Sequence, residues 1–446
     1  MSHVRTCVSV STTRDSSART PSRRLAVLAT GALLASLGAG HALAADAAPL
    51  ELSLEEAVAT AFRHSPRLKA ELARVAEAEA RTVGAGIYPH NPELEVQGAA
   101  RHHPGGTTGD FEVGLSQEFE LAGQRRKRGD VADLELAAAR SGRDSAERLV
   151  AAEVHLAFVD ALEVAAMITV AEAEAELSRQ LLDLSQRRFD AGAGTQLEVN
   201  VASAELGRAE QVVGALAGEY GAARAALAEA VGLPASRLPT PRGSLEAEAE
   251  ALPDLEALLA AAEANRADLV ALDGIERAAK ARVALARAEG RPNLRAGIFV
   301  GREANTDTII GAGLAIPLPF FQRNQGAVAE AQASVARAGA ERDAARLSIA
   351  REVVSAYELY RAGTASLTTL RERVLGTTEE NLELLRKAFE AGKTSWTDVL
   401  VMRRSLFDAR RALVETSAQT RRARVRVDIA AGRLPLPNRS TGEKTQ

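Results

Sequence analysis

The sequence predicts a mainly helical fold with membrane-spanning β-strands, built from two repeats of about 200 residues. Three observations predict this fold. Only 3% of the 446 residues are aromatic, and Ala, Leu, Glu and Arg dominate, which is typical of long helices and coiled coils. A strand-like alternation leads directly into a very long helical pattern. The same succession then occurs again, so each repeat is expected to hold a pair of strands followed by a long helical hairpin.

The stretch from Asp110 to Arg188 shows the repeated unit most clearly. Its first part alternates with a period of two, which indicates a strand with one apolar and one polar face. The alternating apolar positions are Phe111, Val113, Leu115, Phe119 and Leu121. After Gly123 the pattern is helical, and no proline interrupts it before Gly192. At a rise of about 1.5 Å per residue, about 65 helical residues extend over about 97 Å, several times the ordinary helix length.

Caps and breakers place the other elements of the first repeat. Ser53 and Glu56 form a capping-box pattern at the start of the first helix. The run from Tyr88 to Pro92 ends the helical stretch before the first strand. The first repeat is expected at 45–240, with strands at about 92–102 and 110–122 and a helical hairpin at about 124–231.

The second half repeats the punctuation of the first half in the same order. Pro292-Asn293-Leu294 corresponds to Pro92-Glu93-Leu94, and the Phe-x-Ala-Gly motif at 389–392 corresponds to the one at 189–192. Chance similarity between two Ala-rich halves explains this less well, because the matched Pro, Gly and Phe residues keep their spacing. The expected bounds are 241–252 for a linker, 253–432 for the second repeat with strands at about 292–302 and 307–319 and a helical hairpin at about 324–431, and 433–446 for a disordered tail.

Residues 1–44 have the pattern of a secretory signal peptide. Arg23 and Arg24 supply the positive charge, Leu25–Leu37 the apolar segment, and Ala42–Ala44 the cleavage site. The apolar segment is too short to span a bilayer, which disfavours a membrane anchor. The paired arginines also suit a twin-arginine signal, but the residues after them favour the general secretory route. We therefore expect an exported protein.

Composition argues against several kinds of site and partner. Residues 1–44 hold five of the 55 basic side chains, one of the 59 acidic ones, and the only cysteine, Cys7. The remaining chain has a net charge of about −8, which argues against nucleic acid as a partner. We find no His/Cys cluster, no Gly-rich phosphate loop and no nucleophile–base arrangement in its sequence. We predict no catalytic residue, no metal site, no cofactor and therefore no enzyme.

The strands have the length and pattern of strands that cross a membrane. Tilted strands of about 10 residues cross a bilayer, but four of them cannot close a barrel, and open edges are not stable in lipid. Three copies of the chain would supply twelve strands around a polar lumen. Aromatic residues gather near the strand ends, where an aromatic girdle would lie, although a soluble sheet with ordinary core aromatics would also hold them. They are Tyr88, Phe111, Phe119, Phe320 and Phe321.

Five motifs along the chain are more specific than its composition. They are LSLEEAVATA at 52–61, NPELEV at 91–96, GLSQEFELAGQR at 114–125, IPLPFFQRNQG at 316–326 and FEAGKTSWTDVL at 389–400. In this order across two repeats, they resemble the TolC-type outer-membrane efflux channels, and the resemblance extends from about Leu52 to Gly432. The second and third motifs together look closest to the cobalt–zinc–cadmium (CzcC-like) branch, which serves heavy-metal resistance systems.

The resemblance implies a homotrimer with a twelve-stranded β-barrel in the outer membrane and an α-helical barrel across the periplasm. Such a channel contacts outer-membrane lipid, a periplasmic adaptor protein and an inner-membrane pump of the resistance–nodulation–division (RND) class. It is the passive exit duct of a tripartite efflux system, and the branch implies heavy-metal cations as substrates. Because the pump selects the substrate, the sequence leaves open whether it is a metal or an organic compound.

The same resemblance assigns roles to the two hairpin tips. The tips dock the adaptor, and they correspond to Phe189, Gly192 and Thr195 in the first repeat and to Phe389, Gly392 and Ser395 in the second. Glycine suits both turns because it adopts a positive φ without strain, as it does at any helix C-cap. A carboxylate ring that narrows the pore corresponds to Asp398, with Glu198 as its counterpart in the first repeat. Asp398 would also suit an early helical position that the helix dipole favours.

Two other classes of protein are alternatives. A periplasmic adaptor would show a single long helical hairpin with flanking β-rich domains. A secreted structural coiled-coil protein would not need the strand pairs. Two hairpins and four alternating strands favour the channel over both classes.

Overall fold

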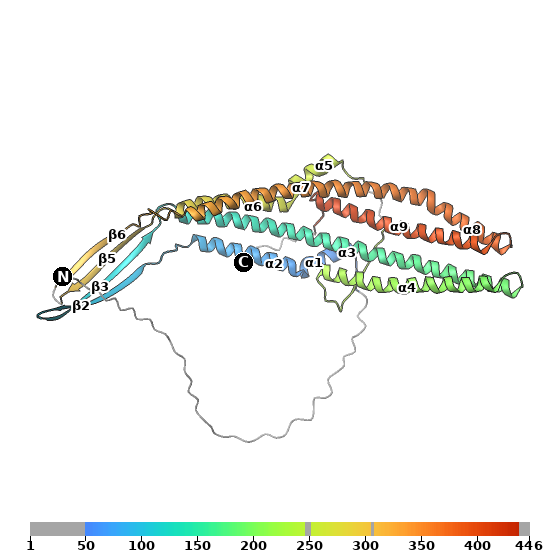
Figure 1. Cartoon of the computed structure of the whole chain (residues 1–446), viewed down its shortest axis with the longest axis horizontal. Helices are drawn as coiled ribbons and strands as arrows, with labels where there is room; N and C mark the ends of the chain where they lie inside the picture. Colours follow the sequence, from blue (N-terminus) through green and yellow to red (C-terminus); the bar gives the residue numbers. More distant parts are fainter. Residues whose placement is uncertain (1–49, 246–250, 305–306, 437–446) are drawn as a thin grey trace, which may run out of the picture. The chain divides into compact units, whose positions relative to one another are not determined.

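The computed structural model describes residues 50–245, 251–304 and 307–436, which belong to one compact unit, Pro49–Gln446 (Figure 1). The predicted signal peptide at 1–44 and the part of the expected tail after residue 436 lie outside the described residues. Helices make up most of the described chain, so the prediction of a mainly helical fold is confirmed.

Both halves of the chain contain the same succession of short helices, two strands and long helices. In the first half these are α1 (Leu54–His64), α2 (Pro66–Gly86), β2 (Glu93–His103), β3 (Gly106–Phe119), α3 (Gln124–Asp190) and α4 (Gln196–Val231). In the second half these are α5 (Leu255–Asn265), α6 (Ala267–Glu289), β5 (Leu294–Glu303), β6 (Asp307–Ala315), α7 (Gln325–Thr369), the π-helix η1 (Leu370–Leu375), α8 (Gly376–Glu390) and α9 (Trp396–Ala430).

The long helices begin and end with the same backbone geometry in both halves. Gly123 (φ 71°) precedes α3, and Asn324 (φ 60°) precedes α7. Gly232 (φ 77°) follows α4, and Gly432 (φ 67°) lies two residues beyond α9. These positive φ values suit glycine and, less often, asparagine, because neither is strongly strained there. The helical limits are therefore set by local sequence as well as by packing.

The four long strands form one antiparallel sheet with the order β2-β3-β5-β6. The central pair, β3 and β5, joins the two halves of the chain, and Val113 of β3 lies opposite both Val96 of β2 and Val300 of β5. In the described chain β2 and β6 each pair on one side only, so the sheet has two open edges. Pairing groups on those edges are therefore available to further strands.

One face of this sheet is apolar, and the other is mostly polar or small, with Phe299 and Ile309 as large apolar side chains on it. Cross-strand partners share a face, so the register places Val96, Val113, Val300 and Ile310 in one row. The neighbouring row on the same face holds Leu94, Leu115, Ile298 and Ala312. The opposite face holds rows such as Gln97, Glu112, Gly301 and Ile309. Several apolar side chains are largely exposed in the single chain, including Ile310 at 81% and Leu94 at 71%.

The strand bounds differ most from the expected ones at two places. β3 begins at Gly106 rather than near residue 110, because Thr107 and Thr108 already pair with β2. β6 ends at Ala315 rather than near residue 319, before two prolines at 317 and 319. Proline cannot donate to a strand ladder, so the pairing stops there.

The first long helix of the second hairpin is interrupted, whereas α3 is continuous. We expected a regular helical hairpin at about 324–431, but within its first half the π-helix η1 separates α7 from α8. The hydroxyl groups of Thr364, Thr368 and Thr369 donate to the carbonyl groups of residues four positions earlier, at 3.1 Å in each case. Such back-bonding competes with the regular helical ladder and bends helices, which gives a physical reason for the interruption.

A short parallel sheet was not predicted from the sequence. β1 (Leu50–Leu52) pairs with β4 (Pro239–Pro241), and the register places Glu51 opposite Thr240. β4 includes Pro241, where the expected linker of 241–252 begins. Two strands of three residues carry too little periodicity to be recognised in a sequence.

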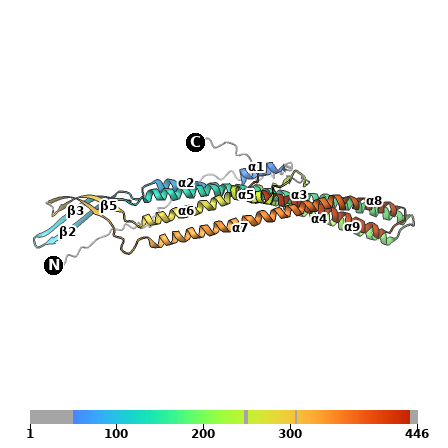
Figure 2. The ribbon, with the colours of Figure 1, turned by 90° about the horizontal axis from the view of Figure 1, so that it is seen from above.

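The long helices pack side by side, as the two views in Figures 1 and 2 show. α3 contacts α2, α4, α6 and α9, and α7 contacts α5, α6 and α9. An apolar stretch of α3 is long enough, by composition alone, to cross a membrane. Val154 and Phe158 are buried against α1 and α4, although only 33% of this stretch is buried in the described chain.

Candidate functional site

The two hairpin tips have the same turn geometry. Gly192 (φ 71°) and Gly392 (φ 70°) each follow the end of a long helix. The amide of Ala193 donates to the carbonyl of Arg188, and the amide of Lys393 to that of Ala388, both at 2.8 Å. This bonding satisfies the last carbonyl groups of the helix, and a positive φ at the glycine makes it possible. Both predicted glycines thus stand at turns that require them.

The helices that follow the tips start with capping boxes. The Thr195 hydroxyl accepts from the amide of Glu198 at 3.3 Å, and the Glu198 carboxylate accepts from the amide of Thr195 at 3.4 Å. Ser395 and Asp398 repeat this arrangement at 3.3 and 3.2 Å. Reciprocal capping satisfies amides that have no partner inside the helix. Thr195 and Ser395 therefore fix where α4 and α9 begin.

Asp398 is exposed, and its Oδ2 atom accepts several hydrogen bonds within its own tip. The donors include the Ser395 hydroxyl at 2.6 Å and the Thr394 hydroxyl at 2.9 Å. These hydrogen bonds, above all the one from Ser395, lower the pKa of the Asp398 carboxyl. In the single chain, Asp398 and Glu198 each cap their own helix.

The two tips are joined by a residue that the sequence reasoning missed. The Arg188 guanidinium donates to the carbonyl of Phe389 at 2.8 Å and to that of Ala193 at 3.0 Å. It also lies 4.5 Å from the centre of the Phe389 ring, a favourable cation–π distance. The two repeats differ here, with Arg188 before one tip phenylalanine and Ala388 before the other. That asymmetry was the available signal in the sequence.

The two tip phenylalanines have different environments. Phe389 is 1% exposed and packs on Trp396, with ring centres 5.2 Å apart. Phe189 is 37% exposed. The buried cluster around Phe389 includes Leu181 and Val399, so it joins α3, α8 and α9. Of the two, only Phe189 presents a large accessible surface to a partner.

Arginines of α9 connect the second hairpin to the first. Arg403 is buried at 4% exposure, and its guanidinium donates to the Ser178 hydroxyl at 2.6 Å and pairs with Glu205. Arg411 pairs with Glu174 of α3 at 2.9 Å. Arg422 pairs with Glu163 of α3 at 2.6 Å. These ion pairs hold the hairpins together along much of α9. One sequence does not predict which residues these arginines contact.

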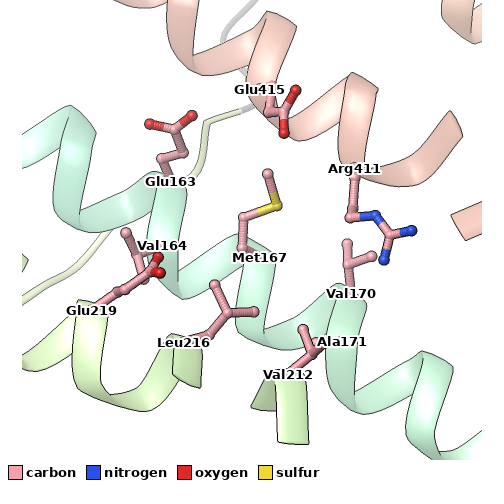
Figure 3. A pocket seen from close by; sticks show the side chains of 10 residues that line it. All are labelled: Glu163, Val164, Met167, Val170, Ala171, Val212, Leu216, Glu219, Arg411 and Glu415. Carbon is pink, nitrogen blue, oxygen red and sulfur yellow. The ribbon is translucent and has the colours of Figure 1, made fainter. Parts of the chain in front are cut away.

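A pocket of about 370 Å³ lies between α3, α4 and α9 (Figure 3). We call it the α3–α4–α9 pocket. It is lined by Glu163, Val164, Met167, Val170, Ala171, Val212, Leu216, Glu219, Arg411 and Glu415. Burial raises the pKa of the Glu163 carboxyl, while the nearby Arg422 opposes this shift. Within the three described segments, no group of three or more His, Cys, Asp or Glu side chains could hold a metal ion.

Comparison with known proteins identifies the family. A family profile described as "Outer membrane efflux protein" matches residues 39–233 and 258–433. The chain is 29% identical to the cobalt-zinc-cadmium resistance protein CzcC of Cupriavidus metallidurans, over 86% of this chain and 90% of that protein. It is 25% identical to the pyoverdine export outer membrane protein OpmQ of Pseudomonas putida, over 80% of each. The solved structure of CusC is similar with a TM-score of 0.74 and 19% identity, over 86% of this chain and 93% of that chain.

Proposed function

Because the chain belongs to the outer membrane efflux protein family, we propose that it is the exit duct of a tripartite efflux system. Members of this family are outer-membrane channels that extend into the periplasm, and they are not enzymes. In the proposed system an inner-membrane RND-type pump supplies the energy, and a periplasmic adaptor joins it to this chain. The duct itself conducts substrates passively to the exterior.

The sheet is the observation that carries this proposal. Its apolar face exposes Leu94, Val96, Ile310 and other large side chains that the described helices do not cover. Its other face is mostly polar or small, apart from Phe299 and Ile309, as expected for a water-filled lumen. Lipid against the apolar face and water against the polar face would satisfy both.

Trimerisation would remove the two open edges of the sheet. Each chain supplies the four strands β2, β3, β5 and β6, and unpaired strand edges are not stable in lipid. Three chains would close a barrel of about twelve strands, an even number like that of other outer-membrane barrels. In that homotrimer each chain would contribute the helical hairpins of both its repeats, 45–240 and 253–432. Together these hairpins would form the periplasmic α-helical barrel.

The hairpin tips are the proposed docking and constriction region. Phe189, Gly192 and Thr195, with Phe389, Gly392 and Ser395, would form the adaptor-docking turns. Asp398 and Glu198 would supply carboxylates to the constriction, and a ring of like charges selects for cations. The capping bonds of Asp398 hold its carboxylate in the charged form, which supports this role.

Heavy-metal cations are the proposed substrates. The name of the CzcC relative, a cobalt-zinc-cadmium resistance protein, supports this class. The OpmQ relative exports pyoverdine by its name, so the family alone does not determine the cargo. An acidic constriction would favour cations of any kind.

Expression of the full chain with its signal region tests the duct. We expect an outer-membrane species of three chains that is stable in mild detergent and dissociates on heating. Deletion of the gene should then sensitise cells to cobalt, zinc or cadmium. A soluble periplasmic monomer would contradict the barrel and favour an adaptor-like protein instead. An outer-membrane trimer without metal sensitivity would contradict the substrate alone.

A further inference from the structure

The α3–α4–α9 pocket opens on the side of α3 away from α1. Phe158 is buried in the core that α3 forms with α1, and Met167 lines the pocket. These residues are nine positions apart, which is two and a half turns at about 3.6 residues per turn, so they point to opposite sides of the helix. α1 and the β1–β4 sheet would obstruct the proposed tube if they lay inside it. In that tube they would therefore lie on the outer side of α3, opposite the pocket. The pocket would therefore face the lumen.

The base of the pocket is apolar. Figure 3 shows Met167 between Val164 and Val170 on α3, with Leu216 and Val212 on α4 beside them. A volume of about 370 Å³ lies within the range of small-molecule sites, which begins at about 300 Å³. Aliphatic side chains and a thioether offer dispersion contacts to an apolar ligand group.

The charged groups around this base leave an excess of negative charge. Among the described residues that line the pocket, Arg411 is the one cation, and it is paired with Glu174 and with Asp408, at 2.9 and 2.6 Å. Glu219 of α4 and Glu415 of α9 are both exposed, and in the described part of the chain neither carboxylate has an ion pair or side-chain hydrogen bond. Carboxylates on two different helices therefore flank an apolar base without a counter-charge.

We propose that this pocket binds a monovalent organic cation that carries an apolar group. The apolar group would lie on Met167 and Leu216, and the positive charge would lie between Glu219 and Glu415. A hydrated metal ion would gain little from the aliphatic base, and the described carboxylates here do not form a metal-binding group. The lumenal position rests on the proposed function, but binding itself can be measured on the isolated protein. A duct requires such binding to be weak, so that the ligand also leaves.

The test is a titration of the detergent-solubilised full chain with benzyltriethylammonium, followed by saturation-transfer difference NMR. Tetramethylammonium provides a cation without a large apolar group, and benzenesulfonate an aromatic anion. The variant Glu219→Gln/Glu415→Gln keeps side-chain shape and removes the two charges. The matched control Glu229→Gln/Glu380→Gln removes two exposed charges elsewhere, on α4 and α8. A third variant, Met167→Gln, changes the base but no charge.

Benzyltriethylammonium should bind more tightly than either comparator. The double pocket variant should weaken its binding about fivefold or more, since two partly screened carboxylates are lost. Met167→Gln should weaken it about threefold, through lost apolar contact, while leaving tetramethylammonium unchanged. Equal weakening by the control pair would overturn the proposal, because bulk charge would then explain binding. Equal affinity for tetramethylammonium would overturn it too. A soluble monomer with the expected binding would support the pocket while contradicting the duct.

Discussion

Two substitutions on one strand test which face of the sheet meets lipid. Val96 and Gln97 are neighbours on β2, so their side chains point to opposite faces. Val96 is 58% exposed in the single chain and lies in a row with Val113 and Val300, near the middle of the strands. An arginine on the lipid face near the bilayer midplane destabilises a barrel by about 2–4 kcal/mol. We therefore expect Val96→Arg to lower the stability of the assembled protein by about this amount in each chain.

Gln97→Arg is the matched control for this prediction. It introduces the same side chain one position away on the opposite, mostly polar face, where we expect a change within about 0.5 kcal/mol. Denaturant midpoints of the protein in lipid vesicles, together with the fraction that migrates as a heat-sensitive trimer, measure both variants. Similar losses for the two variants, or a larger loss for Gln97→Arg, would refute the assignment of the faces.

Three further predictions concern the hairpins. Gly392→Val should destabilise the second tip by about 1–2 kcal/mol, because a side chain is strained at the positive φ of this residue. Gly376→Ala, inside a helix, should not destabilise the protein. Thermal unfolding of the two purified variants measures this difference. Arg403→Met should lower the unfolding free energy by about 1–3 kcal/mol, because Glu205 loses its buried partner but keeps its pair with Arg208, and Arg403→Met/Glu205→Met should recover part of this loss. The pKa of Asp398 is lower in the folded chain, so its stabilising contribution is present at neutral pH and lost as the pH falls below about 4. Asp398→Asn should therefore reduce the difference in melting temperature between pH 7 and acid, and an unchanged difference would contradict this role.

Local patterns in the sequence predict much of this fold. The alternation from Phe111 to Phe119 and the long pattern after Gly123 correspond to β3 and α3. Gly192 and Gly392 mark turns that no other residue makes as easily. These features depend on backbone chemistry within a few residues, which one sequence displays directly.

Features that depend on distant contacts were not predicted. The bonds between Arg188 and Phe389 join residues of different repeats, and the pairing of Arg403 with Glu205 joins different hairpins. The α3–α4–α9 pocket likewise forms where three helices meet. The π-helix η1 was missed for another reason, because the threonines before it are ordinary residues in a helical pattern. Their effect became clear only from the bonds that their hydroxyl groups make.

The pairing of β3 with β5 has a consequence for the synthesis of the protein. β2 and β3 can form a hairpin as soon as they leave the translocation machinery, but β5 is made only after the whole first helical hairpin. Contacts between such distant segments form slowly, because a long loop must close first. During that interval the apolar face of the early hairpin is exposed to water and prone to aggregate. The nascent chain should therefore depend on periplasmic chaperones from the moment β3 emerges until β5 arrives.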